Sequence, residues 1–131
     1  MTYLNIYESA ARMIGVVGTS ELTEDYEERA PYLLATFVSQ CAQQDRKYRI
    51  ANGLEKAIVP HVAAVKMSDA FPLSDVFLSA AGYYLAAMLI MEENEDMSEQ
   101  LFDRYCDALA SIEASLPATT APIKNKYPGL L

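Results

Sequence analysis

The 131-residue chain has one histidine and two cysteines, and it lacks the short motifs on which most enzymes depend. His61 follows Pro60 with no carboxylate at helical spacing, so a histidine-based catalytic or metal pair cannot be built within one chain. No P-loop, dinucleotide-binding, nucleophile-elbow or zinc-protease motif occurs. The acidic run 92–100 lacks the glycine that a calcium loop needs at its sixth position. We therefore expect no enzymatic activity, no cofactor and no bound metal.

The two cysteines show no metal-binding or redox spacing. Cys41 and Cys106 lie 65 positions apart in apolar surroundings, without a CxxC pair. A chain of this length forms about one domain and buries roughly two-thirds of its unfolded surface, so it needs no covalent crosslink. The simplest interpretation is two reduced thiols in the core, and the alternatives are a disulfide or a reactive thiol.

Basic residues are scarce, with 10 Lys and Arg against 18 Asp and Glu, for a formal net charge of -8. This balance disfavours a nucleic-acid phosphate backbone as partner, and the short basic run 46–49 is better explained by a surface patch or a protein contact. In the middle of the sequence, basic residues form a cluster of Arg46, Lys47, Arg49 and Lys56. Acidic residues are concentrated in 21–28 and 92–107. These runs are either solvated faces or complementary halves of a head-to-tail contact between copies.

The one long uncharged run is too short to cross a membrane. The N-terminus has Glu8 and Arg12 where a secretory signal would be apolar, which favours synthesis in a cytoplasm. Val76–Met91 holds sixteen uncharged residues, which span about 24 Å as a helix against a hydrocarbon layer of about 30 Å. No Lys or Arg flanks it to bind headgroups. We therefore predict a central helix of a globular fold, over about 75–93, covered on all sides by its neighbours.

Periodic apolar residues predict three helices around this centre. The first begins at Tyr3, and the second carries Leu33 to Cys41 with Pro31 in its first turn, or with a kink at Pro31 if 23–30 is helical too. Ser74 is the expected N-cap of the central helix, and the last helix begins after Asp96. Its expected inner stripe is Leu101, Phe102, Tyr105, Cys106, Leu109, Ile112 and Leu116. The fold class is thus an all-α small bundle of about four helices.

Two segments have no helical period. Residues 46–74 contain a turn signal at Asn52-Gly53 and two prolines, and we expect an irregular segment with one short extended or helical piece around 57–65. Residues 117–131 contain three prolines, and they predict an extended C-terminal arm beside a single domain at 1–116. The apolar residues of this arm fit either a frayed terminus or a strap that docks on another subunit.

The chain resembles small helical structural proteins of tailed bacteriophages and prophages, of the head-tail connector or adaptor type. The resemblance covers most of the chain and is carried by "ARMIGVVG" (11–18), "ERAPYLLATFVSQC" (28–41), the run 71–112 and "APIKNKYPG" (121–129). The most specific part is "YYLA" at Tyr83–Ala86, followed by an acidic turn and a helix with "FDRY". These are packing patterns without a catalytic signature.

The resemblance implies a virion component that forms a homo-oligomeric ring between portal and tail, made in the bacterial cytoplasm and then placed in the neck of the virion. Its partners would be the portal or tail-completion proteins, with no membrane and no direct nucleic-acid contact. The candidate partner-binding residues are Arg46, Lys47, Arg49, Ile123, Lys124, Lys126 and Tyr127. The alternative is a small acidic cytoplasmic adaptor or regulatory protein that binds a basic partner.

Overall fold

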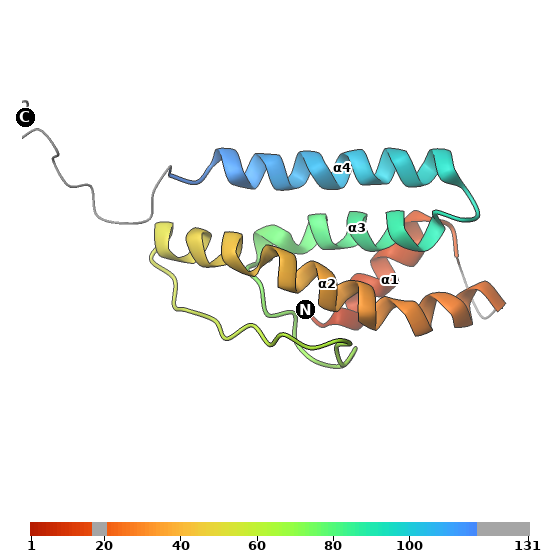
Figure 1. The fold of residues 1–131 in the computed structure, drawn as a ribbon, viewed down its shortest axis with the longest axis horizontal. Coiled ribbons are helices and arrows are strands. Elements are labelled where there is room, and N and C mark those ends of the chain that lie inside the picture. The colour runs from red at the N-terminus through yellow and green to blue at the C-terminus, as the bar shows by residue number, and fades with distance from the viewer. Residues whose placement is uncertain (17–20, 118–131) are drawn as a thin grey trace, which may run out of the picture.

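The computed structural model describes residues 1–16 and 21–117, and this part of the chain is all-α (Figure 1). Its elements are α1 (Tyr3–Met13), α2 (Glu21–Ala51), a 3-10 turn η1 (Asp75–Phe77), α3 (Leu78–Ile90) and α4 (Glu95–Ala114). Within the described residues the only β pairing is an isolated bridge between Thr2 and Ala70. The predicted bundle of four helices is therefore confirmed.

Helix α3 is the centre of the bundle, in contact with α1, α2 and α4. Most of the buried residues of α3 are alanine or glycine. Nine of its thirteen residues are buried: Ala80, Ala81, Gly82, Tyr84, Leu85, Ala86, Ala87, Leu89 and Ile90. Small side chains allow neighbouring helices to approach closely, and a Cβ added at Gly82 would meet the Met13 side chain at 3.3 Å. No helix in the described part of the chain is long and apolar enough to cross a membrane. Most of the uncharged run lies in the interior of the fold, as its lack of charge predicted, but Val76, Ser79 and Met91 are exposed, so the run is not covered on all sides.

An aromatic cluster joins the layers around α3. Phe37 of α2 is fully buried, and its ring centroid lies 5.7 Å from that of Tyr84 in α3 and 6.1 Å from that of Tyr105 in α4. The Phe71 ring stacks on the Phe37 ring with a centroid distance of 6.4 Å, and it meets the ring of Tyr3 in α1 edge-on at a centroid distance of 5.9 Å. Each such pair contributes about 0.5–1.5 kcal/mol beyond the area it buries. One side chain thus links four segments that are far apart in sequence.

The irregular segment begins later than predicted, because α2 continues to Ala51 before the turn at Asn52-Gly53. Gly53 has a φ of +67°, which a residue with a Cβ adopts only with strain, and this confirms the turn. No helix or strand forms in 57–65, contrary to expectation. Segment 52–74 is instead held by backbone bonds. Tyr3 donates to the Asp69 carbonyl at 3.1 Å and Leu4 to the Met67 carbonyl at 2.9 Å, which satisfies free N–H groups at the start of α1.

Helix α2 starts at Glu21, so Pro31 lies in its interior and not in its first turn. An interior proline removes one helical hydrogen bond and costs about 3 kcal/mol. Burial on both sides of it offsets this cost, since Tyr26, Ala30, Leu34 and Phe37 are all fully buried. The Pro31 carbonyl also accepts a hydrogen bond of 3.1 Å from the Val65 N–H, which ties segment 52–74 to the helix.

Two predicted helix starts are corrected. The Ser74 side chain makes no capping bond, and η1 precedes α3. Helix α4 begins at Glu95, where the Asn94 side chain accepts a hydrogen bond from the Met97 N–H at 3.0 Å. Asparagine is as good an N-cap as serine or aspartate, and it stands two residues before the expected start.

The inner face of α4 is narrower than predicted. Ser98, Leu101, Tyr105 and Ile112 are buried, but Cys106 is exposed and Phe102 is 39% exposed. The reason is that α4 packs mainly on α3 at the edge of the bundle, so only one stripe of the helix is covered (Figure 1). The prediction of two core thiols is therefore right for Cys41 and wrong for Cys106.

Truncation of the central helix tests this packing. Leu85 is fully buried in α3, so Leu85→Ala should lower the free energy of unfolding by about 2–5 kcal/mol through lost burial and a residual cavity. Ile58 is 94% exposed, and Ile58→Ala should change the same quantity by less than about 0.5 kcal/mol. Urea unfolding followed by circular dichroism measures both, and similar values for the two variants would contradict a central α3.

Candidate functional site

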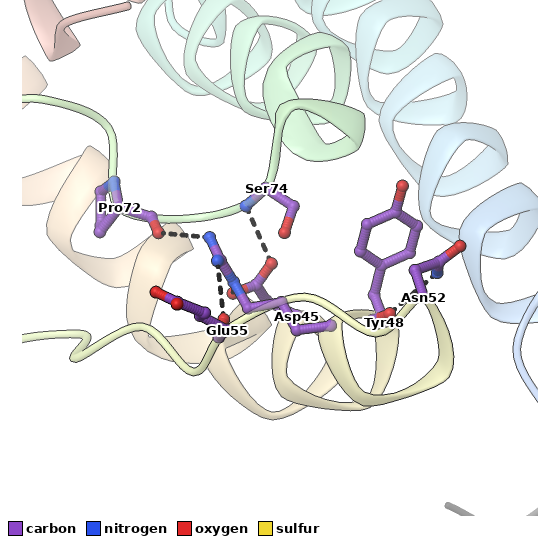
Figure 2. Close-up of polar contacts among 7 residues, drawn as sticks. Asp45, Tyr48, Asn52, Glu55, Pro72 and Ser74 are labelled. Carbon is purple, nitrogen blue, oxygen red and sulfur yellow. Dashed lines mark hydrogen bonds and ion pairs between the residues drawn. The ribbon is translucent and has the colours of Figure 1, made fainter.

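A polar cluster at the C-terminal end of α2 fastens the irregular segment to the helix (Figure 2). Asp45 is buried, and its carboxylate accepts a hydrogen bond of 2.8 Å from the Ser74 N–H. The second carboxylate oxygen accepts a 2.9 Å bond from Arg49 Nε, one helical turn further along. A buried carboxylate needs such partners, because an unpaired charge away from water is costly. We call Asp45, Arg49 and Ser74 the Arg49 cluster.

The guanidinium of Arg49 spans the two ends of the segment. Its Nη1 donates to the Glu55 carbonyl at 3.1 Å, and its Nη2 donates to the Pro72 carbonyl at 3.2 Å (Figure 2). The side chain is only 19% exposed. Arg49 was predicted to bind a partner, and the structure places three of its N–H donors in contacts within the chain. The Arg49 side chain therefore holds the backbone at Glu55 and Pro72 against α2.

A basic groove lies beside the Arg49 cluster, with a volume of about 520 Å³. Arg46 and Lys56 are exposed in it, and neither has an ion-pair partner in the described part of the chain. The carboxylate of Asp45 is paired with Arg49, so the groove keeps a positive charge. Its lining residues are Ala42, Gln43, Asp45, Arg46, Arg49, Lys56, Ala57, Val59 and His61. We call this surface the basic groove.

The other predicted partner-binding residues are not all brought together. Lys47 lines a separate polar groove between α2 and α4, near Gln44 and Glu113. Gln44 Nε2 donates to the Leu109 carbonyl at 3.3 Å and to Glu113 Oε2 at 3.0 Å, so these helices meet there. Ile123, Lys124, Lys126 and Tyr127 lie outside the described residues, as does nearly all of the predicted arm 117–131.

Two acidic segments meet at the other end of the molecule. Arg29 of α2 donates from Nη2 to the Met88 carbonyl at 3.0 Å, which joins the start of α2 to the end of α3. Tyr26 is buried close by, and desolvation followed by the charge of Glu93 raises its pKa to about 12. We call this region the acidic end. Its exposed carboxylates are Glu24, Asp25, Glu27, Glu28, Glu92, Glu93, Glu95 and Asp96.

The α2 residues that line the basic groove, 42–49, lie near the C-terminal end of this helix, and the α2 residues of the acidic end, 24–28, lie near its start. The two ends of α2 lie far apart in the molecule (Figure 1). Asp25 and Arg46 are separated by 21 positions of one helix, or about 32 Å. This distance is several times the screening length of about 8 Å at physiological ionic strength. The acidic end and the basic groove therefore act on the surroundings separately.

The remaining chemistry is sparse. No group of three or more His, Cys, Asp or Glu residues that could hold a metal ion occurs within 1–16 and 21–117. The buried thiol of Cys41 has its pKa raised to about 11, first by desolvation and then by the nearby charge of Asp45, so it stays protonated at neutral pH.

Sequence reasoning missed part of this geometry. Lys56, which the sequence already grouped with Arg46, meets His61 in the basic groove because segment 52–74 folds back along α2, and no periodic pattern reports such a return. The buried pairing of Asp45 with Arg49 was not predicted, and a spacing of four is also typical of exposed helix pairs. No family model, curated protein or solved structure matches the chain.

The Arg49 cluster predicts unequal effects for two neighbouring arginines. Arg49→Lys loses the planar fork that reaches Asp45, Glu55 and Pro72, and it should lower the free energy of unfolding by about 1–3 kcal/mol. The same change at exposed Arg46, three residues away, should cost less than about 0.5 kcal/mol. Denaturant unfolding gives the stabilities, and limited proteolysis of 54–73 should accelerate only in the Arg49 variant. Equal behaviour of the two variants would show that the cluster fastens nothing.

Proposed function

We propose that the protein is a non-enzymatic structural component of a tailed phage or prophage virion, a head-tail connector of the neck that assembles as a ring. The observation that carries the proposal is the separation of charge along α2, with the acidic end and the basic groove about 32 Å apart. The resemblance of the sequence to connector and adaptor proteins supplies the biological setting.

Opposite charges at opposite ends favour a heterologous contact. The acidic end of one copy would face the basic groove of the next, and a head-to-tail contact of this kind closes into a ring when its rotation permits. Like ends repel, so the charges also disfavour a symmetric dimer through either surface. Each contact can be weak, because closure of a ring raises the effective concentration of the remaining partners.

The partners of such a ring would be the portal on one side and tail-completion proteins on the other. The net charge of -8 disfavours direct contact with packaged DNA, so the protein would act through protein surfaces. No catalytic step enters this proposal. Its location would be the cytoplasm of the infected bacterium during synthesis and the neck after assembly.

A second candidate function is a small adaptor or regulatory protein that binds a basic partner. The exposed carboxylates of the acidic end favour it, since they would attract a cationic protein without any ring. The two functions differ in the basic groove: an adaptor would not need Arg46 and Lys56, whereas a ring requires both ends of every copy.

Charge reversal at one end tests the ring. Arg46→Glu with Lys56→Glu makes both ends acidic, and Glu24→Lys with Glu28→Lys weakens the acidic end, so each double variant alone should lose self-association. A mixture of the two variants should form a heterodimer, because the intact acidic end of the first variant meets the intact basic groove of the second, but it should not form larger assemblies. Sedimentation velocity over a concentration series at low and high salt measures the association, which salt should weaken.

Matched controls are Lys66→Glu and Glu8→Lys, which alter exposed charges outside the two surfaces and should associate like the unaltered chain. Association that ignores both double variants, or a chain that stays monomeric in every sample, would contradict the ring.

A further inference from the structure

An apolar groove with a carboxylate rim lies beside the acidic end, between the end of α3 and the first half of α4. Its volume is about 440 Å³. The hydroxyl of Ser98 is already used, since it donates to the Ala87 carbonyl at 2.8 Å. The remaining polar groups at the rim are carboxylates. The lining residues are Met88, Met91, Glu95, Ser98, Glu99, Phe102 and Asp103, and we call this surface the Met-Phe groove.

The floor of the groove is exposed apolar surface. Met91 is 47% exposed and Phe102 is 39% exposed, although the sequence pattern placed Phe102 in the core. Methionine side chains adapt to a partner's shape, and an aromatic ring supplies a large contact area. Three carboxylates, Glu95, Glu99 and Asp103, surround this floor and have no ion-pair partner in the described part of the chain. A fitting ligand therefore combines apolar and cationic side chains.

We propose that the Met-Phe groove binds residues 118–131 of a second copy of the chain. This segment has Ile123, Tyr127, Leu130 and Leu131 as its large apolar residues, and Lys124 and Lys126 are its only charged side chains. Lysines on both sides of Asn125 can reach carboxylates while Ile123 or Tyr127 contacts Phe102. Pro122 and Pro128 disfavour a helix, which suits an extended peptide in a surface groove.

The position of Pro117 favours a neighbouring copy over the same chain. The described chain leaves α4 at its C-terminal end (Figure 1), and Phe102 lies 12 positions, or about 18 Å, before Ala114, the last residue of the helix. To reach its own groove, the segment must reverse direction at once and run back along α4. A head-to-tail neighbour brings its acidic end toward the point where the segment begins, and this argument rests on the proposed ring.

Disulfide trapping identifies the occupant in the full-length chain. Cys106→Ser removes the exposed thiol, while buried Cys41 with its raised pKa stays as a silent thiol. One variant then carries Met91→Cys and the other Tyr127→Cys, and the two are mixed under mild oxidation. A non-reducing gel measures the rate at which the mixed dimer forms. The matched control places the cysteine at exposed Ile58, away from the groove.

The Met91 variant should crosslink to the Tyr127 variant at least about tenfold faster than the Ile58 variant does, because a bound segment has a high effective concentration. Equal rates for Met91 and Ile58 would overturn the proposal. So would a chain carrying both Met91→Cys and Tyr127→Cys that forms only an intrachain disulfide, since the segment would then occupy its own groove.

A synthetic peptide of residues 118–131 separates this inference from the ring itself. Its fluorescence anisotropy should rise on titration with the full-length protein, and the rise should be lost with Phe102→Glu or with a peptide carrying Lys124→Glu and Lys126→Glu. A saturable rise, in a protein whose self-association does not change in either charge-reversal variant, would reject the ring and keep the pairing of segment and groove. A salt-sensitive ring without peptide binding or trapping would keep the ring and reject the pairing.

Discussion

The need to bury the apolar surface of α3 is the constraint on which the rest of the structure depends. A helix whose buried residues are almost all apolar or small cannot face water, and α1, α2 and α4 supply its cover. Phe37 shows how fully they do so, because its ring touches α3, α4 and the irregular segment together. Segment 52–74 is fixed to the same assembly by Arg49, by Val65 and by the start of α1.

This packing also explains how the acidic end forms. Helix α3 runs opposite to α2 and α4, so the start of α2 and the turn after α3 come to the same end (Figure 1). Both of these segments are acidic in sequence, and the end of α2 is basic. The direction of the helices therefore converts two distant acidic runs into one surface. The proposed ring uses that surface and the basic groove as its two halves.

The core could be predicted from the sequence because burial imposes a period on apolar residues, as Ile6, Ala10, Leu34 and Leu101 illustrate. Positions at the edge of the bundle could not. Phe102 and Cys106 have core-like spacing, but no neighbour covers that side of α4, and spacing alone does not reveal the width of a contact. The Arg49 cluster and the basic groove depend on a non-periodic segment folding back, and this return is visible only in three dimensions. Pro31 within α2 shows tertiary burial overriding a local helix breaker.

The most direct test of end-to-end polarity is zero-length carbodiimide cross-linking of an equal mixture of ¹⁴N- and ¹⁵N-labelled protein at low salt, analysed by mass spectrometry. The account predicts mixed-isotope links that join Lys56, the lysine of the basic groove, to carboxylates in 24–28 or 92–96 of another copy. It is contradicted if Lys66, which lies outside the basic groove, forms such links as often, or if every link lies within one copy.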